Sequence, residues 1–247
     1  MTRAIAGVTV FTSMWIFSQP SAVVPSFEVA SVKLTSHGRT ADGWSFSDVR
    51  IVSPGRLVAT NASLDECIRW AYQLKEYQVS GPGWLNSDAA SYDIEAKAPP
   101  ETAPQQMRLM FQALLAERFK LTVHHETRTL SVYELVVAKS GPKLQEASST
   151  ARPGFSSQGG RGGVRMNAQK VTLAGFADWL SRNVERPVID KTNLTGDFGF
   201  KLEWAREGDG PSVFTALQDQ LGLKLQATKA PIEILVIDHA EKVPTEN

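Results

Sequence analysis

The chain has 247 residues, of which 42% are hydrophobic, and its 26 basic residues are balanced by 26 acidic ones. This length allows one large domain or two small ones with a sizeable core. The net charge is zero and no basic run is present, so no net electrostatic field attracts the chain to nucleic acid. We therefore do not expect nucleic acid as a partner.

The N-terminus has the composition of a secretory signal. Arg3 supplies a positive charge, Ala4 to Phe17 is apolar apart from three hydroxyl residues, and small and polar residues follow as far as Ala22. We therefore predict a signal peptide over residues 1–22 and a periplasmic or extracellular location. The apolar stretch is short for a transmembrane span, so none is expected in the mature chain. Cleavage after Ala22 and retention as an anchor are both compatible with this pattern.

Cys67 is the only cysteine, so no disulfide can form within the chain. It falls on the apolar face of a predicted helix, where a thiol is usually a small buried hydrophobic group. The fold must therefore depend on its hydrophobic core alone.

The first half of the chain is predicted to span residues 27–139. Ser63 and Glu66 form the capping-box pattern at the start of its first helix. Its predicted elements are strands at 27–34 and 56–60, a helix from 63, a strand at 92–98, a helix after 104, and a closing hairpin of strands 120–127 and 130–138.

A Gly-, Ser- and Pro-rich segment, residues 140–163, has almost no periodicity and predicts a flexible linker. The second half, residues 164–243, then repeats the order of elements. Its predicted elements are a strand at 164–168, a helix capped by Thr172, a strand at 198–204, a helix from 212, and a hairpin of strands 223–227 and 232–239.

The two halves also match in sequence. Trp70 corresponds to Trp179, and "VYELVV" at 132–137 corresponds to "IEILVI" at 232–237. We predict an α+β fold with a duplicated helix–strand–helix–hairpin unit of about 80 to 110 residues, its helices packed on mostly antiparallel sheets. Chance similarity between short amphipathic segments is the alternative explanation.

Several motifs in order, including "NASLDECIRWAY", "YQVSGPGWLNSDAASYDIEAKA", "QMRLMFQALLAERFKL" and "VIDKTNLTGDFGFKLEW", resemble a soil-associated bacterial family of secreted proteins of unknown function. The resemblance extends from Phe27 to about Val243. Members occur as many paralogues in one genome and are sometimes fused to a membrane metallopeptidase similar to antibiotic-sensing receptors. The resemblance implies a sensory or interaction role, and it supplies no catalytic residues.

His124, His125 and Glu126 are the most concentrated set of ionisable side chains. In a strand, His124 and Glu126 share one face and His125 points to the other, so adjacent residues cannot both bind one ion without a bulge. We expect the exposed end of a hairpin at this position. The alternative is a metal or acid–base site completed by His239.

Trp84 and Trp44 are the candidate partner-binding residues, because exposed aromatic area often marks recognition. Packing into the core is the other explanation for large aromatic side chains.

These observations together predict an exported, non-catalytic binding or interaction module of the cell envelope, without a cofactor. Its partner would be an envelope protein or a small ligand. Two alternatives are a metal-dependent hydrolase that uses His124, His125 and Glu126, and a sensor that binds a small ligand between the two halves.

Overall fold

The computed structural model describes residues 25–35, 47–87, 90–148, 150–160, 163–205 and 210–245. The expected signal peptide and Trp44 lie outside these residues. In the described part, the strands form three four-stranded sheets whose pairings are mostly antiparallel, which confirms the predicted α+β class. No helix among these residues is long and apolar enough to cross a membrane.

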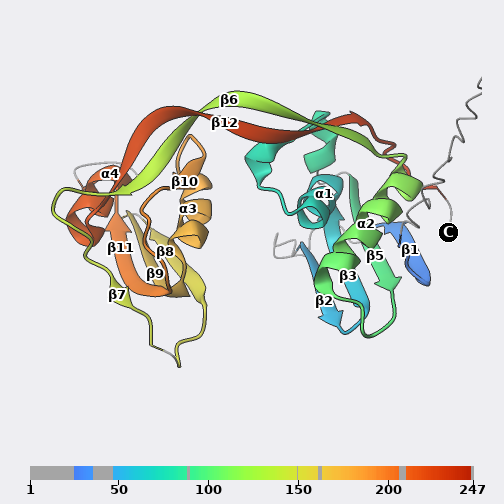
Figure 1. The fold of residues 1–247 in the computed structure, drawn as a ribbon, viewed down its shortest axis with the longest axis horizontal. Helices are drawn as coiled ribbons and strands as arrows, with labels where there is room; N and C mark the ends of the chain where they lie inside the picture. The colour runs from blue at the N-terminus through green and yellow to red at the C-terminus, as the bar shows by residue number, and fades with distance from the viewer. Residues whose placement is uncertain are drawn as a thin grey trace, which may run out of the picture.

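The first unit is an antiparallel sheet covered by two helices (Figure 1). In sheet order its strands are β1 (Val29–Leu34), β5 (Ser91–Lys97), β3 (Arg56–Ser63) and β2 (Asp48–Ser53), and its helices are α1 (Leu64–Tyr72) and α2 (Pro104–Phe119). The predicted capping box is present, because the Glu66 amide donates to Ser63 Oγ over 3.2 Å and the Ser63 amide donates to Glu66 Oε2 over 2.9 Å. The predicted N-terminal strand is also confirmed as β1.

The second unit has the same construction. Its strands in sheet order are β7 (Gln145–Glu146), β11 (Phe198–Trp204), β9 (Gly163–Val171) and β8 (Gly154–Gly160), and its helices are α3 (Leu173–Ser181) and α4 (Val213–Ala216), which a π-helical turn at Leu217–Leu221 continues. Thr172 caps α3 as predicted, accepting from the Gly175 amide over 3.1 Å.

Part of the predicted flexible linker, residues 140–163, forms strands. This segment supplies β7 and β8, and β8 pairs with β9 along its length. Phe155 anchors it by stacking on Trp179, with ring centroids 6.0 Å apart. The strand β8 is not evident from the sequence, because it is an edge strand with one half-buried apolar residue, Phe155, in an otherwise Gly- and Ser-rich stretch.

The third sheet is built around two long strands, β6 (Thr122–Val137) and β12 (Leu223–His239), which pair with each other antiparallel over their lengths. The short strands β10 (Val188–Asp190) and β4 (Val79–Ser80) add in parallel to β6 and β12, respectively. The two predicted hairpins are therefore wrong. Residues 127–130 and 228–231 contain no Gly or Asn to adopt a tight hairpin turn, so each strand continues straight.

The β6–β12 ribbon exchanges strands between the two units (Figure 1). Tyr133 and Leu135, near the end of β6, are buried in the core of the second unit. Leu235 and Ile237, near the end of β12, are buried in the core of the first. The predicted halves, 27–139 and 164–243, are therefore not self-sufficient, because each core needs a strand that begins in the other unit.

The geometry of the two units agrees with an internal duplication. Leu130 lies opposite Ala230 in the ribbon, and each stands two residues before its matching segment, 132–137 or 232–237. Asn61 and Lys170 each have a left-handed backbone, with φ of 47° and 49°, two residues before the cap of the first helix. A Cβ on Gly55 would lie 2.3 Å from the Ala98 carbonyl oxygen, and a Cβ on Gly163 would lie 2.2 Å from that of Trp204, so both positions require glycine.

The strand exchange predicts that a substitution late in the chain destabilises the first unit. Leu235→Ala removes a side chain with no exposed surface from that core and should lower the free energy of unfolding by about 2 to 5 kcal/mol. Val243→Ala, at a position that is 67% exposed, is the control and should change it by less than about 0.5 kcal/mol. Urea unfolding measures both, and equal stabilities of the two variants would contradict the exchange.

Candidate functional site

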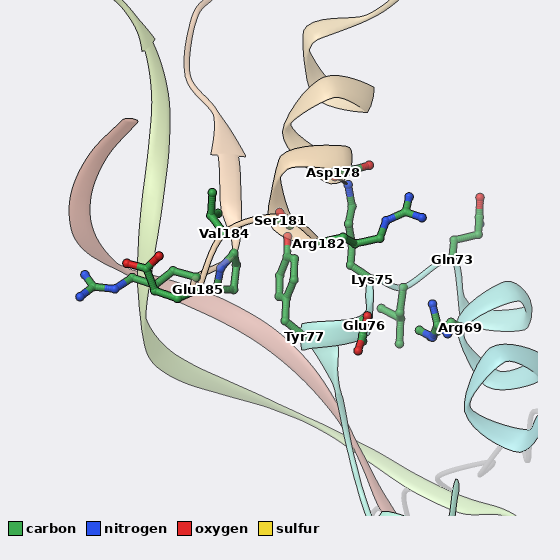
Figure 2. Close-up of a pocket in the computed structure, with 13 residues that line it drawn as sticks. Arg69, Gln73, Lys75, Glu76, Tyr77, Asp178, Ser181, Arg182, Val184 and Glu185 are labelled. Carbon is green, nitrogen blue, oxygen red and sulfur yellow. Dashed lines mark hydrogen bonds and ion pairs between the residues drawn. The ribbon is translucent and has the colours of Figure 1, made fainter. Parts of the chain in front are cut away.

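A cleft of about 850 Å³ lies between the two units (Figure 2). The first unit lines it with Arg69 of α1, with Gln73, Leu74 and Lys75 at the end of that helix, and with Glu76 and Tyr77 of the 3-10 turn η1 (Glu76–Gln78). The second unit lines it with the end of α3 and the loop at 182–187 that leads into β10. The cleft thus lies between equivalent segments of the duplicated unit.

The ends of the two helices explain why these loops face each other. The Leu74 amide donates to the Arg69 carbonyl over 2.9 Å, and Gln73 adopts a left-handed backbone that ends α1. In the second unit the Asn183 amide donates to the Leu180 carbonyl over 2.7 Å. Each loop then continues into a short strand, β4 or β10, and these add to the two outer edges of the same ribbon. The ribbon therefore holds both loops at the cleft.

One ion pair bridges the units directly. Lys75 Nζ from the first unit contacts the Asp178 carboxylate on α3, and both side chains are more than one-third exposed. An ion pair of this exposure contributes at most about 1 kcal/mol. The pair therefore helps to orient the two loops without locking them together.

Tyr77 stands inside the cleft, with its ring extending from η1 toward the end of α3 in Figure 2. Burial and the nearby Asp178 charge both raise the pKa of its phenol. The hydroxyl consequently stays protonated at neutral pH and is available as a hydrogen-bond donor to a ligand.

Glu185 and Arg186 lie at the other end of the cleft and are engaged by the ribbon. Tyr133 of β6 donates its hydroxyl to Glu185, and this hydrogen bond lowers the pKa of the Glu185 carboxyl. The Arg186 guanidinium lies 5.2 Å from the centroid of the Tyr133 ring, within cation–π range. These two charges are therefore held by Tyr133.

The predicted His124–His125–Glu126 site lies on the ribbon and not in the cleft. His124 Nδ1 is 2.8 Å from an Asp238 carboxylate oxygen, and His125 Nδ1 is 2.7 Å from Glu233 Oε1. These contacts join neighbouring strands and are ordinary cross-strand pairs.

The structure also does not complete this set with a further ligand. Glu126 pairs with Arg128, and His239 is exposed opposite Thr122. Over the described ranges of the chain, no three His, Cys, Asp or Glu side chains are grouped so that they could hold a metal ion.

Trp84 and Cys67 both belong to the packing of the first unit. Trp84 lies in the 3-10 turn η2 (Gly83–Asn86) and packs, half-buried, against the first core. Cys67 is fully buried, and this burial raises the pKa of its thiol, as expected for a small hydrophobic group.

Sequence reasoning missed the residues of the cleft. Those that matter most, Tyr77 and Arg182, lie in short charged loops without periodicity, a pattern shared by many surface turns. The usable signal was the duplication itself, because equivalent segments of a two-fold repeat can meet at its axis. The strand exchange is not visible in the sequence, so the sequence does not indicate which of the equivalent segments meet.

The family described as "Protein of unknown function (DUF3738)" matches residues 65–240. The chain belongs to this family. The matched residues begin in α1 and end just after β12, so they include all the residues that line the cleft. The predicted resemblance to a family of unknown function is confirmed. No curated protein and no solved structure matches the chain.

The raised pKa values of the tyrosines predict that the folded chain loses stability at high pH. All four have a raised pKa, that of Tyr92 to about 12 through burial. Because the unfolded chain releases these protons near pH 10 and the folded chain releases them later, their contribution to stability is complete below pH 10 and is lost as the pH rises through the folded values.

Tyrosinate absorbance should therefore rise at higher pH in the native chain than in urea. Tyr77→Phe should remove one late-titrating group. Coincident titrations of the native and unfolded chains would contradict these raised pKa values, which arise from burial at Tyr72, Tyr77 and Tyr92 and mainly from the hydrogen bond to Glu185 at Tyr133.

Proposed function

We propose that this chain is a non-catalytic binding module of the cell envelope that holds a small ligand in the cleft between its two units. The observation that carries the proposal is the cleft itself, to which both units contribute polar side chains. Ligand sites occur preferentially at interfaces between domains, and a volume of about 850 Å³ is within the range of small-molecule pockets.

The polar groups of the cleft support binding rather than catalysis. Ser181 is the serine in the cleft lining and the candidate for a nucleophile. Its hydroxyl donates to the Ala177 carbonyl over 2.9 Å and accepts from the Val188 amide over 2.8 Å. Both bonds are to the backbone, so no general base activates this oxygen. The histidines His124 and His125 lie on the ribbon, away from the cleft lining.

The envelope location rests on the N-terminal pattern of Arg3 followed by the apolar stretch from Ala4 to Phe17. A ligand held between two units would also link their relative positions, which is what a sensor requires. The resemblance to proteins fused to receptor-like metallopeptidases supports the same role.

A pair of tyrosine variants tests the cleft as the binding site. The mature chain is screened by thermal melting against a library of small metabolites. A ligand at about 100 times its Kd should stabilise the chain by about 2.7 kcal/mol, or about 5 to 10 °C. Tyr77→Ala should abolish this rise. Tyr72→Ala is the control, because Tyr72 is also half-buried but lies outside the cleft lining and should leave the rise intact.

Either of two results would contradict the proposal. One is a library in which nothing stabilises the chain. The other is a ligand whose effect is the same in Tyr77→Ala as in the unaltered chain, which would place its site elsewhere.

A second candidate function is the binding of an extended segment of another envelope protein along β8. Among the described strands, β8 is at the end of its sheet and pairs on one side only. It carries no charged residue, and every residue except Phe155 is exposed. An uncharged, unpaired edge of this kind accepts a further strand, since none of the usual protective lysines or prolines is present.

Cross-linking in cells tests this second function. A tagged chain should capture one envelope protein reproducibly, and Ser156→Lys/Gln158→Lys should abolish the capture by charging the edge. Ser140→Lys/Gln226→Lys adds the same charge at exposed positions outside β8 and should retain it. Capture that survives the β8 substitutions would exclude strand addition at this edge.

A further inference from the structure

The charges that line the cleft are of both signs. Four residues are cationic and three are anionic: Arg69, Lys75, Arg182, Arg186, Glu76, Asp178 and Glu185. A nearly balanced set is unlike the uniformly basic lining expected of a site for a simple phosphate or polycarboxylate. The pattern of pairing among these groups therefore decides what the cleft could bind.

Most of these charges already have partners. Arg69 Nε is 2.6 Å from an Asp65 carboxylate oxygen, on the preceding turn of α1. Lys75 is paired with Asp178, and Tyr133 holds Glu185 by a hydrogen bond. Arg186 lies over the Tyr133 ring. Bringing a ligand to any of these groups would mean competing with an existing contact.

Arg182 and Glu76 differ from the rest. Among the residues that the structure describes, no hydrogen bond or ion pair engages either side chain, and the two do not pair with each other. They come from different units, one from the end of α3 and the other from η1. Figure 2 places both near Tyr77, whose protonated hydroxyl is a further donor.

We propose that the cleft binds a small zwitterion with a free carboxylate and a free ammonium group, namely an amino acid or a short peptide. The inference rests on the proposed function of the cleft. Arg182 would bind the ligand carboxylate through the bidentate geometry that guanidinium groups favour, and Glu76 would bind the ammonium group. The apolar side chains of Leu74, Val184 and Pro187 supply surface for the rest of the ligand.

The pair of opposite charges also provides discrimination. A simple anion would satisfy Arg182 and leave Glu76 without a partner, and a simple cation would do the reverse. A ligand with both groups satisfies both side chains at once, and its two charges bridge the two units.

The test uses the common amino acids and a mixed pool of dipeptides as probes, with calorimetry on the full mature chain. The best probe is then compared with its N-acetyl form, which lacks the ammonium group, and its C-terminal amide, which lacks the carboxylate. Each modification should weaken binding by about 10- to 100-fold, the usual effect of losing a hydrogen bond to a charged group.

Substitutions in the chain should reproduce these losses selectively. Arg182→Gln should weaken binding of the zwitterion but leave the affinity for its C-terminal amide unchanged. Glu76→Gln should also weaken binding of the zwitterion but leave the affinity for its N-acetyl form unchanged. Both side chains are exposed, so both variants should fold. Arg152→Gln and Glu241→Gln, at exposed positions outside the cleft lining, are the matched controls and should bind as the unaltered chain does.

The outcomes separate this inference from the proposed function. If no amino acid or dipeptide binds, or if Arg182→Gln and Glu76→Gln bind the zwitterion unchanged, the inference is wrong. A ligand of another class whose effect depends on Tyr77 would overturn the inference and leave the binding function in place. If no ligand of any class binds, both are wrong.

Discussion

The antiparallel pairing of β6 with β12 is the interaction on which the rest of the structure depends. It is the longest strand pairing in the described chain, and it also carries each strand from the unit in which it begins into the core of the other. The short strands β4 and β10 extend the same sheet on its two edges. One continuous four-stranded sheet therefore belongs to both units, and neither core is complete without it.

This exchange also produces the cleft. Since β4 and β10 are held on opposite edges of the ribbon, the loops that precede them end up on facing sides of the two units. The direct contact between the two units at this place is a partly exposed ion pair of Lys75 with Asp178 on α3, which is a weak interaction. The ribbon therefore sets the position of the cleft, while the loop residues remain available to a ligand.

The duplicated scaffold has diverged where the two copies meet. The N-terminal caps of α1 and α3 and the glycines at positions 55 and 163 are alike in both units, because the local backbone geometry demands it. The cleft residues are not alike. Counting from the caps Ser63 and Thr172, Arg182 takes the place of Gln73 and Arg186 that of Tyr77. A symmetric framework thus carries an asymmetric set of side chains, which suits a ligand whose two ends differ.

The sequence by itself determined the class of the fold, the order of the main helices, and the helix caps Ser63 and Thr172. Helix periodicity, the Ser63–Glu66 capping box and alternating apolar residues act over a few neighbouring residues, so they are visible without the tertiary structure. The strand β8 was missed because an edge strand buries only Phe155. Tertiary structure alone decided that β6 and β12 run straight and exchange units, since the pairing of Leu130 with Ala230 joins residues that are far apart in the chain. It also decided the cleft, because Tyr77, Arg182 and Glu76 come together only after that exchange has fixed which loops face each other.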